Sequence, residues 1–298
     1  MRSTISNDPI PEPAFAASGP GSAKYGNVFF HVGLHKTATS YLQDVVFPQW
    51  RGVRYLRFRN LEYFLALPED GKYLVSCENI SGATFAPLDE RCRGLTRLAE
   101  MFPGAHVIIA FRPHGDFIAS LYSQYLRYGG QARFDGFFST GRDDAVWRCE
   151  DLSYRRLIET IEEAFNAKPF VFQLGELKSN PGALYTDLAR FMGTPPPTAL
   201  DSGSPRNVSL GSWQGRLLRR INELVDTPYS RDGGNRPYRR LHRLRLDPPT
   251  ICHRILGRLP KQPLVSREAR QQITDSYRDD WDFVTAYIQS LPFRKLAA

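Results

Sequence analysis

The stretch FFHVGLHKTATSYLQ, residues 29–43, decides the fold because it changes from an apolar run to a helical pattern within a few residues. It indicates a buried strand, a short loop and the start of a helix. The loop contains one lysine, Lys36, and three hydroxyl side chains, Thr37, Thr39 and Ser40. The start of a helix attracts anions, since its first N–H groups lack helical partners and its dipole is positive there. The stretch therefore predicts an anion site at the carboxyl end of a strand.

Four further apolar runs, most of them followed by helical patterns, favour an α/β protein with a parallel sheet. Most runs are apolar almost throughout, as expected for strands that are covered on both faces. Strands are expected at 27–33, 72–78, 105–112 and 169–174, with a weaker fifth at 52–56. Helices are expected at 39–47, 88–102, 115–128, 152–166, 182–192 and 212–225, and a last one at about 266–291. The predicted architecture is a P-loop-like central parallel sheet of about five strands flanked by helices, with a helical, basic C-terminal part.

Composition and charge narrow the class of protein. The 298 residues include 42% hydrophobic side chains, enough to bury the core of one large domain. We expect a flexible leader at residues 1–25, rich in Pro, Ser, Gly and Ala, and one α/β domain at 26–298. The formal net charge of +8 and the sequence pI of about 9.4 favour anionic partners over cationic ones. No apolar run approaches the roughly 20 residues that a membrane span needs.

The cysteines and histidines show no metal-binding pattern. The four cysteines lie far apart and form no CxxC pair. Such spacing disfavours a zinc site or a disulfide framework and favours a reducing compartment, so a cytoplasmic location is expected. His31, His106, His242 and His253 also lack ligand spacing, and we expect no metal.

The loop at Lys36 differs from the kinase-type loop GxxxxGK[ST]. That loop needs two glycines to wrap its backbone around the phosphates and a Ser or Thr to hold magnesium. Here Gly33 precedes Lys36 by three residues, and no glycine stands directly before the lysine. The strand VIIAF (107–111) is followed by Arg112 rather than by the aspartate that anchors magnesium in kinase-like folds. An anionic ligand without metal is the prediction.

The segment HVGLHKTATSYLQ (31–43) resembles the 5′-phosphosulfate-binding loop of sulfotransferases that use 3′-phosphoadenosine 5′-phosphosulfate (PAPS). It is most similar to the HKTGTT-type loop of bacterial members. The resemblance implies that the donor is PAPS and that its 5′-phosphosulfate is bound by His35, Lys36, Thr37, Ala38, Thr39 and Ser40. Ala38 stands where the family usually has glycine, and Ser40 where it has threonine. Both departures are expected to be mild, because alanine fits if its φ is negative and serine keeps the hydroxyl.

A second segment, VIIAFRPHGDFIASLYSQYLRYG (107–129), continues the resemblance. In the family, an arginine at a strand end and a serine eight residues later bind the 3′-phosphate, and Arg112 and Ser120 have this spacing. A guanidinium group matches a phosphate with two parallel hydrogen bonds. Asp116 lies one helical turn before Ser120, so a local pair between the two is the alternative.

A third segment, RNVSLGSW (206–213), shares only its Arg, Gly and Trp with the family's RKGxxGDW segment, which closes over the adenosine and the 3′-phosphate. The resemblance nominates Arg206 as a donor-binding residue. The alternative is a plain loop leading into a helix, capped by Ser209 or Ser212.

The resemblance implies transfer of a sulfuryl group to an acceptor. Lys36 is nominated to stabilise the charge that develops on the leaving oxygen. The acceptor hydroxyl must lose a proton, and Glu78, His35 and His114 are candidate bases. Glu78 ends the strand KYLVSCE (72–78), on the same sheet edge as Lys36. The sequence does not decide which of Glu78, His35 and His114 is the base.

The C-terminal third carries a cluster of arginines from Arg216 to Arg258. An acidic polysaccharide or an anionic glycolipid acceptor would explain it, and a solvated basic face is the alternative. Nucleic acid is disfavoured because aromatic residues in the cluster are limited to Tyr229 and Tyr238. Acceptor-side loops are expected at about 129–151 and 216–262. The predicted activity is PAPS-dependent sulfation of a carbohydrate or glycolipid hydroxyl, with peripheral membrane contact allowed. A P-loop kinase or nucleotidase and a non-catalytic nucleotide- or polyanion-binding protein are the alternatives.

Overall fold

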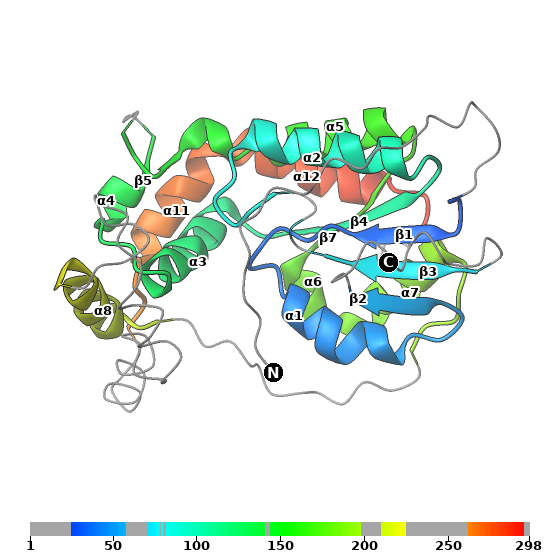
Figure 1. The fold of residues 1–298 in the computed structure, drawn as a ribbon, viewed down its shortest axis with the longest axis horizontal. Helices are drawn as coiled ribbons and strands as arrows, with labels where there is room; N and C mark the ends of the chain where they lie inside the picture. The colour runs from blue at the N-terminus through cyan, green and yellow to red at the C-terminus, as the bar shows by residue number, and fades with distance from the viewer. Residues whose placement is uncertain are drawn as a thin grey trace.

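The structure is a computed structural model that describes residues 25–57, 71–77, 79, 82–140, 144–197, 210–224 and 262–294. Its centre is a parallel sheet of five strands in the order β2-β3-β1-β4-β7 (Figure 1). The strands are β1 (Val28–His31), β2 (Arg54–Arg57), β3 (Tyr73–Ser76), β4 (His106–Phe111) and β7 (Phe170–Gln173). All five predicted strands are confirmed, and the weaker one at 52–56 forms the edge strand β2.

The side chains of β4 show why the runs are apolar throughout. Successive residues of a strand point to opposite faces of the sheet. Val107 and Ile109 pack into one hydrophobic core, whereas Ile108 and Ala110 pack into a second core on the other face. Because both faces are buried, every position of the strand is apolar after His106.

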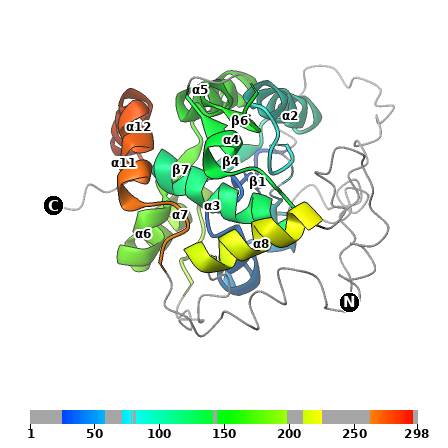
Figure 2. The same ribbon diagram turned by 90° about the vertical axis from the view of Figure 1, so that its left-hand side faces the viewer.

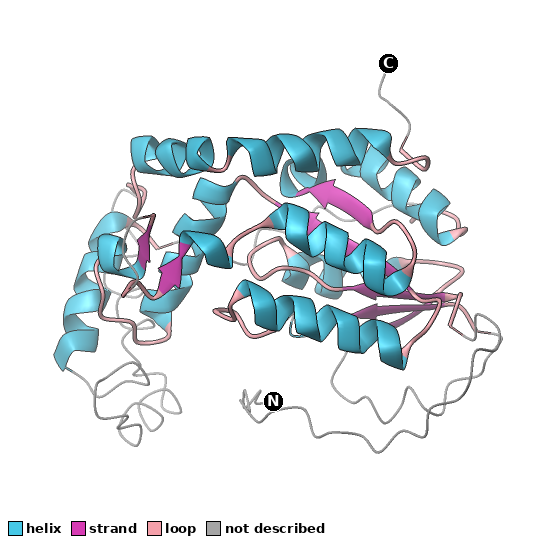
Figure 3. Ribbon diagram, turned by 90° about the horizontal axis from the view of Figure 1, so that it is seen from above, coloured by secondary structure: helices cyan, strands magenta, loops and turns pink. Residues whose placement is uncertain are grey.

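Helices cover both faces of the sheet (Figures 1 and 3). The first core lies between the sheet and three helices, α2 (Leu88–Met101), α5 (Tyr154–Phe165) and α12 (Arg278–Ser290). The second core lies between the sheet and the segment from α1 (Thr39–Tyr41) to Trp50, α6 (Leu174–Ser179) and α7 (Pro181–Met192). The predicted fold class, a five-stranded parallel α/β sheet with helices in its C-terminal part, is therefore confirmed.

A further group of helices lies beyond one end of the sheet, nearest the viewer in Figure 2. It is built on α3 (His114–Arg127), which follows β4 after two residues. α8 (Ser212–Leu224) and α11 (Arg267–Ser276) both pack against α3. Because α3 begins where β4 ends, this group belongs to the carboxyl edge of the sheet, where ligands bind in open α/β folds.

The helix predicted at 39–47 has an irregular form. It begins as one α-helical turn at α1, continues as a π-helix over Leu42–Val46 and ends as a 3₁₀ turn over Phe47–Gln49. Pro48 lies in that last turn, where its missing N–H costs no helical hydrogen bond. π-helical turns are rare overall, and many of those that occur lie at functional sites.

The prediction of a single last helix at about 266–291 is wrong. The chain forms two helices there, α11 and α12, which are separated at Tyr277. The ring of Tyr277 stacks on His114 at 4.4 Å between centroids, and its hydroxyl donates to the carbonyl of Cys149 at 2.7 Å. These long-range contacts hold Tyr277 outside a regular helix. Periodicity does not reveal them.

The loop predicted at 129–151 contains more structure than expected. It forms the short helix α4 (Phe134–Phe137), the strands β5 (Phe138–Ser139) and β6 (Trp147–Arg148), which pair in parallel, and a 3₁₀ turn over Cys149–Asp151. The rings of Phe137 and Trp147 are buried in the first core. The segment is therefore part of the packed body of the protein.

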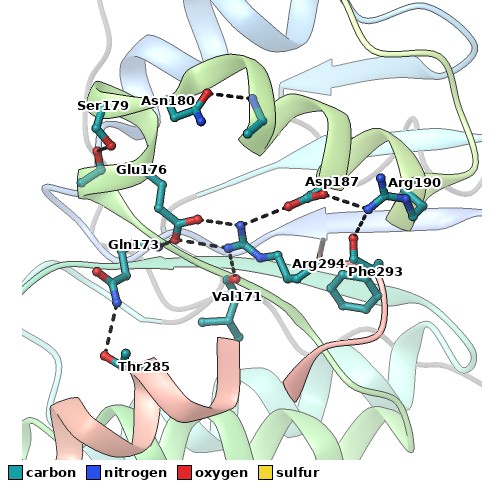
Figure 4. A network of polar contacts seen from close by, with 12 residues as sticks. Val171, Gln173, Glu176, Ser179, Asn180, Asp187, Arg190, Thr285, Phe293 and Arg294 are labelled. Carbon is teal, nitrogen blue, oxygen red and sulfur yellow. Dashed lines mark hydrogen bonds and ion pairs between the residues drawn. The ribbon is translucent and has the colours of Figure 1, made fainter. Parts of the chain in front are cut away.

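The end of the described chain is fixed by a network around Arg294 (Figure 4). Arg294 forms a two-pronged ion pair with Glu176 on α6, at 2.6 and 3.2 Å, and donates to the carbonyl of Val171 at 2.7 Å. Its Nη1 also lies 3.7 Å from the carboxylate of Asp187 on α7. The segment after α12 is thereby tied to β7, α6 and α7. Within the described part of the chain, every helix is too short or too polar to cross a membrane.

Candidate anion-binding site

The loop between β1 and α1 turns sharply at two residues with positive φ. Lys36 has a φ of 71° and Ala38 a φ of 63°. The negative φ that would let alanine replace glycine without strain is therefore not met at Ala38. An L-residue in this left-handed region costs roughly 1–2 kcal/mol, which explains why glycine suits the position. The turn directs the chain into α1. The first hydrogen bond of that helix, from Leu42 N–H to the Ala38 carbonyl at 3.1 Å, offsets part of the strain.

Gly33 allows the loop to close on itself. A Cβ atom at this residue would lie 2.5 Å from Thr39 Oγ1 and 3.1 Å from Cε1 of His31. Any larger residue would therefore push the loop away from the first turn of α1. Such a close backbone approach is a common reason for glycine at an anion-binding turn.

Side chains of the loop alternate between the interior and the surface. His35, Thr37 and Thr39 are buried, whereas Lys36 and Ser40 are partly exposed. The hydroxyl of Thr37 donates to the carbonyl of Leu34 at 2.5 Å, so it shapes the loop from inside. Lys36 and Ser40 are thus the polar side chains of the loop that reach solvent.

Thr39 is the first residue of α1, and its buried Oγ1 has no hydrogen-bond partner among the described residues. Because leaving a buried hydroxyl without a partner costs free energy, such an atom marks a place where a polar ligand or water fits. The two residues on either side, Ala38 and Ser40, are partly exposed, so this place adjoins the surface of the loop.

His35 is neutral near pH 7. Burial, together with the nearby charges of Arg91 and Lys36, lowers the pKa of its imidazole from 6.5 to about 4, and a hydrogen bond with Asn79 opposes this shift. A neutral histidine adds no positive charge to an anion site. Its contact with Asn79 joins the loop to the segment that follows β3.

His31 lies beneath the loop in a polar cluster between β1 and β3. It is opposite Ser76 in the sheet register, and its Nδ1 lies 2.8 Å from Ser76 Oγ. Gln43 donates to the same oxygen at 3.0 Å. Full burial lowers the pKa of His31 from 6.5 to about 3, so the ring is neutral. The sequence offered only the absence of ligand spacing at His31 and did not predict this support.

Arg112 reaches the loop from the neighbouring strand. Its Nη1 donates to the carbonyl of Lys36 at 3.3 Å, and its buried Nε has no hydrogen-bond partner among the described residues. Its own carbonyl accepts a hydrogen bond from the hydroxyl of Tyr154 at 3.0 Å. Burial lowers the pKa of the guanidinium from its usual value. The structure thus brings Lys36 and Arg112 together, as their positions at adjacent strand ends predict.

Ser120 lies on α3 and is partly buried, eight residues after Arg112. Asp116 accepts a hydrogen bond from Arg270 on α11 at 2.8 Å, so its described ion-pair partner lies across the interface with α11 and not within α3. Arg270 adds a second guanidinium near Arg112, where its charge contributes to the lowered pKa of Arg112. No sequence signal placed Arg270 here, because it lies 154 residues after Asp116 in the chain.

His114 is an unsuitable base in this structure. It begins α3, as expected, but its side chain is fully buried between the rings of Tyr154 and Tyr277, at 4.1 and 4.4 Å. Its Nε2 lies 2.9 Å from the carboxylate of Asp280 on α12. The pairing places His114 within the packing of α3, α5 and α12. Glu78 and Arg206, the other predicted functional residues, lie outside the described residues.

The residues present fit an anionic ligand of the phosphate type. Lys36 supplies a partly exposed charge, Arg112 supplies a guanidinium with a buried donor atom, and Thr39 supplies a hydroxyl. All three lie where β1 and β4 end, and these strands pair directly. Charge-assisted hydrogen bonds of this kind each contribute about 1.5–3 kcal/mol.

The fold and this loop define the chain as an open parallel α/β protein with a candidate anion site at the carboxyl edge of its sheet. The chain was compared with protein families, with curated proteins and with solved structures. No protein-family model and no curated protein matches the chain. Among solved structures, the chain is similar to a sulfotransferase from Alicyclobacillus acidocaldarius, with a TM-score of 0.46 and 15% sequence identity over 60% of this chain and 85% of that one.

Proposed function

We propose that this protein is a sulfotransferase that moves a sulfuryl group from PAPS to a hydroxyl group of a carbohydrate or glycolipid. The observation that carries the proposal is the contact of Arg112 with the loop at Lys36, 3.3 Å between Nη1 and the carbonyl oxygen. It places the guanidinium of Arg112 against the backbone of the loop that carries Lys36. PAPS carries two anionic groups, a 5′-phosphosulfate and a 3′-phosphate, which such a pair of positions suits.

Each residue has a role in the proposed reaction. Lys36 and the first N–H groups of α1 hold the 5′-phosphosulfate, and Arg112 and Ser120 hold the 3′-phosphate. The bond between sulfur and the bridging oxygen breaks while the acceptor oxygen bonds to sulfur. Lys36 stabilises the negative charge that the bridging oxygen gains. The proton of the acceptor hydroxyl passes to a base, for which Glu78 at the end of the β3 segment is the candidate.

The structure changes two of the assigned roles. His35 is buried and has a pKa of about 4, so it contributes to the loop as a neutral hydrogen-bonding group rather than as a charge. Thr37 donates its hydroxyl to Leu34 and supports the backbone of the loop. We therefore assign both residues to positioning of the loop that holds the donor.

Arg112 also separates this proposal from a kinase or nucleotidase. In kinase-like folds a carboxylate at the corresponding strand end holds the magnesium ion that accompanies the nucleotide. Here the strand ends with Phe111 and is followed by a guanidinium group. A cation at this edge attracts a phosphate directly and repels a metal ion.

The test is transfer of labelled sulfate from PAPS to a panel of polysaccharides, glycolipids and phenols. We expect transfer to at least one hydroxyl acceptor, and Lys36→Ala to lower it by about a hundredfold or more. Lys178→Ala is the matched control, since Lys178 is an exposed lysine on α6. A Lys36→Ala variant with the turnover of the wild type would contradict the role of the lysine.

Glu78→Gln tests the base separately. It keeps the size of the side chain and removes its basicity, so we expect slower transfer with unchanged affinity for 3′-phosphoadenosine 5′-phosphate (PAP). Equal turnover in the variant and the wild type would exclude Glu78 as the base. A chain that binds PAP tightly but transfers no sulfate to any acceptor would instead support the nucleotide-binding alternative.

A further inference from the structure

Helix α8 exposes a row of large hydrophobic side chains. Among the described residues, four large hydrophobic side chains are exposed, and three of them lie on α8: Trp213 at 59%, Leu217 at 36% and Leu224 at 86%. At 100° per residue, these three positions fall within about 40° of the helix circumference. They form one stripe, which we call the α8 stripe.

The opposite face of α8 is fixed to the body of the protein. The side-chain amide of Asn222 donates to the carbonyls of Leu126 and Gly130 at 2.8 and 2.9 Å, and Gln131 donates to the carbonyl of Asn222 at 2.7 Å. Leu218 is fully buried on the same face. Because these bonds set the rotation of the helix, the α8 stripe points away from α3.

Positive charge borders the stripe. Arg216 and Arg220 are exposed and lie beside it on the helix, and the guanidinium of Arg216 is 5.5 Å from the centre of the Trp213 ring. The following residues, 225–261, contain eight arginines and one lysine but only three aspartates. An apolar row next to arginines, with tryptophan at one end, is the pattern of helices that lie in a membrane interface.

We propose that the α8 stripe docks on a lipid surface that carries anionic head groups. Trp213, Leu217 and Leu224 bury their apolar surface at the boundary between head groups and acyl chains. Arg216 and Arg220 contact the anionic head groups, which attract basic residues within a Debye length. The contact is peripheral.

The position of α8 connects this surface to the candidate site. α8 packs on α3, and α3 begins two residues after β4, at the sheet edge that carries Arg112 (Figure 2). Docking would therefore hold the carboxyl edge of the sheet near the lipid surface. If the proposed function is correct, this arrangement favours an acceptor hydroxyl that is carried by a lipid. The docking itself does not depend on sulfuryl transfer.

Tryptophan fluorescence gives a direct test. Of the four tryptophans, Trp50 and Trp147 are buried and Trp281 is partly buried, so exposure singles out Trp213. The full chain is mixed with vesicles of phosphatidylcholine alone or with added phosphatidylglycerol. We expect a blue shift of the emission, quenching by brominated lipids and co-sedimentation with the anionic vesicles, with affinity about tenfold or more above that for the neutral ones.

The Leu217→Ser, Leu224→Ser double variant keeps the tryptophan and removes two apolar contacts. We expect its affinity for anionic vesicles to fall about tenfold or more. Val146→Ser is the matched control, because Val146 is the one exposed large hydrophobic residue away from α8 in the part of the chain that the structure describes. Arg216→Gln, Arg220→Gln should reduce the preference for anionic vesicles and its dependence on salt. The melting temperature of each variant, measured without vesicles or nucleotide, should stay close to that of the wild type, which shows that the variants fold.

Four results would overturn the proposal. They are no binding to anionic vesicles, equal binding by the leucine double variant, a blue shift with PAP in the absence of vesicles, and a blue shift that follows protein concentration alone. The second would assign lipid binding to another part of the chain, the third would assign Trp213 to the nucleotide site, and the fourth would assign the stripe to a second copy of the chain. Vesicle binding is measured without PAPS, so its failure and a failure of the proposed function are distinguishable.

Discussion

The Nη1 atom of Arg112 donates a hydrogen bond to the carbonyl oxygen of Lys36 across 3.3 Å. The contact joins two neighbouring strand ends, because Lys36 follows β1 and Arg112 follows β4. It satisfies a carbonyl in a loop whose backbone is strained, with positive φ at Lys36 and Ala38. The guanidinium therefore supports the shape of the loop while its Nε stays available for a ligand within the described part of the site.

Arg112→Ala should lower the affinity for PAP by about tenfold to a hundredfold, since a charge-assisted hydrogen bond contributes about 1.5–3 kcal/mol. Arg112→Lys should recover little of this affinity, because a lysine keeps the charge but loses the planar pair of donors. Calorimetric titration with PAP measures both effects. Arg97→Ala, at an exposed position of α2, is the control and should bind as the wild type does. Full affinity in Arg112→Ala would remove the residue from the donor site.

Ala38→Gly should stabilise the protein. Glycine relieves the strain of the φ of 63°, and the greater freedom of glycine in the unfolded chain offsets part of the gain. We expect the free energy of unfolding to rise by about 0.5–1 kcal/mol, measured by urea denaturation. The matched control is Ala119→Gly within α3, which should lower it by about 1 kcal/mol or more. A loss of stability in Ala38→Gly would show that the alanine methyl group makes contacts that outweigh the strain.

Acid should destabilise the protein well before its carboxylates titrate. The pKa values of His31 and His35 are lowered by burial from 6.5 to about 3 and about 4. The unfolded chain therefore binds protons below about pH 6.5 that the folded chain does not bind, and the free energy of unfolding falls as the pH drops. Each histidine contributes a slope of at most about 1.4 kcal/mol per pH unit.

Urea denaturation at several pH values between about 7 and 5 measures this slope. His35→Gln should make the dependence on pH shallower by the share of one histidine, whatever its effect on stability at pH 7. His31→Gln should do the same. A slope equal to that of the wild type in both variants would show that neither histidine causes the loss of stability in acid.

Arg294→Ala should lower the free energy of unfolding by about 3 kcal/mol, because it leaves the carboxylates of Glu176 and Asp187 without their shared buried partner. Figure 4 shows that Arg190 still contacts Asp187, so the loss centres on Glu176 and the carbonyl of Val171. Arg278→Ala breaks an exposed pair with Asp275 and should cost about 0.5 kcal/mol or less. Equal costs for the two variants would show that the network around Arg294 is no stronger than a surface ion pair.

Local pattern predicted the sheet well because four of its strands are short apolar runs, and only the edge strand β2, with an arginine at each end, gave a weaker signal. β4 is the clearest case, since burial on both faces leaves five consecutive buried positions after His106. The approach of Lys36 and Arg112 was also predictable, because the ends of parallel strands share one edge of the sheet. The order of strands and loops along the chain was therefore sufficient to predict the sheet and the approach of Lys36 and Arg112.

Other features depend on contacts between distant parts of the chain. Tyr277 interrupts a helical pattern because it stacks on His114, which lies far earlier in the sequence. Arg270 approaches Asp116 because α11 packs on α3, another contact between distant parts of the chain. The positive φ of Ala38 follows from the sharpness of a turn that the residue type disfavours. A single sequence contains no local signal for any of the three.

The proposed donor site is tested most directly by a calorimetric titration of the full chain with PAP and with ADP, each in the presence and absence of magnesium. We predict that PAP binds about tenfold or more tightly than ADP, because the proposed contacts of Arg112 and Ser120 are with the 3′-phosphate that ADP lacks. We also predict that magnesium leaves the affinity for PAP unchanged. Tighter binding of ADP with magnesium than of PAP would exclude the proposed two-phosphate donor site and favour a kinase or nucleotidase.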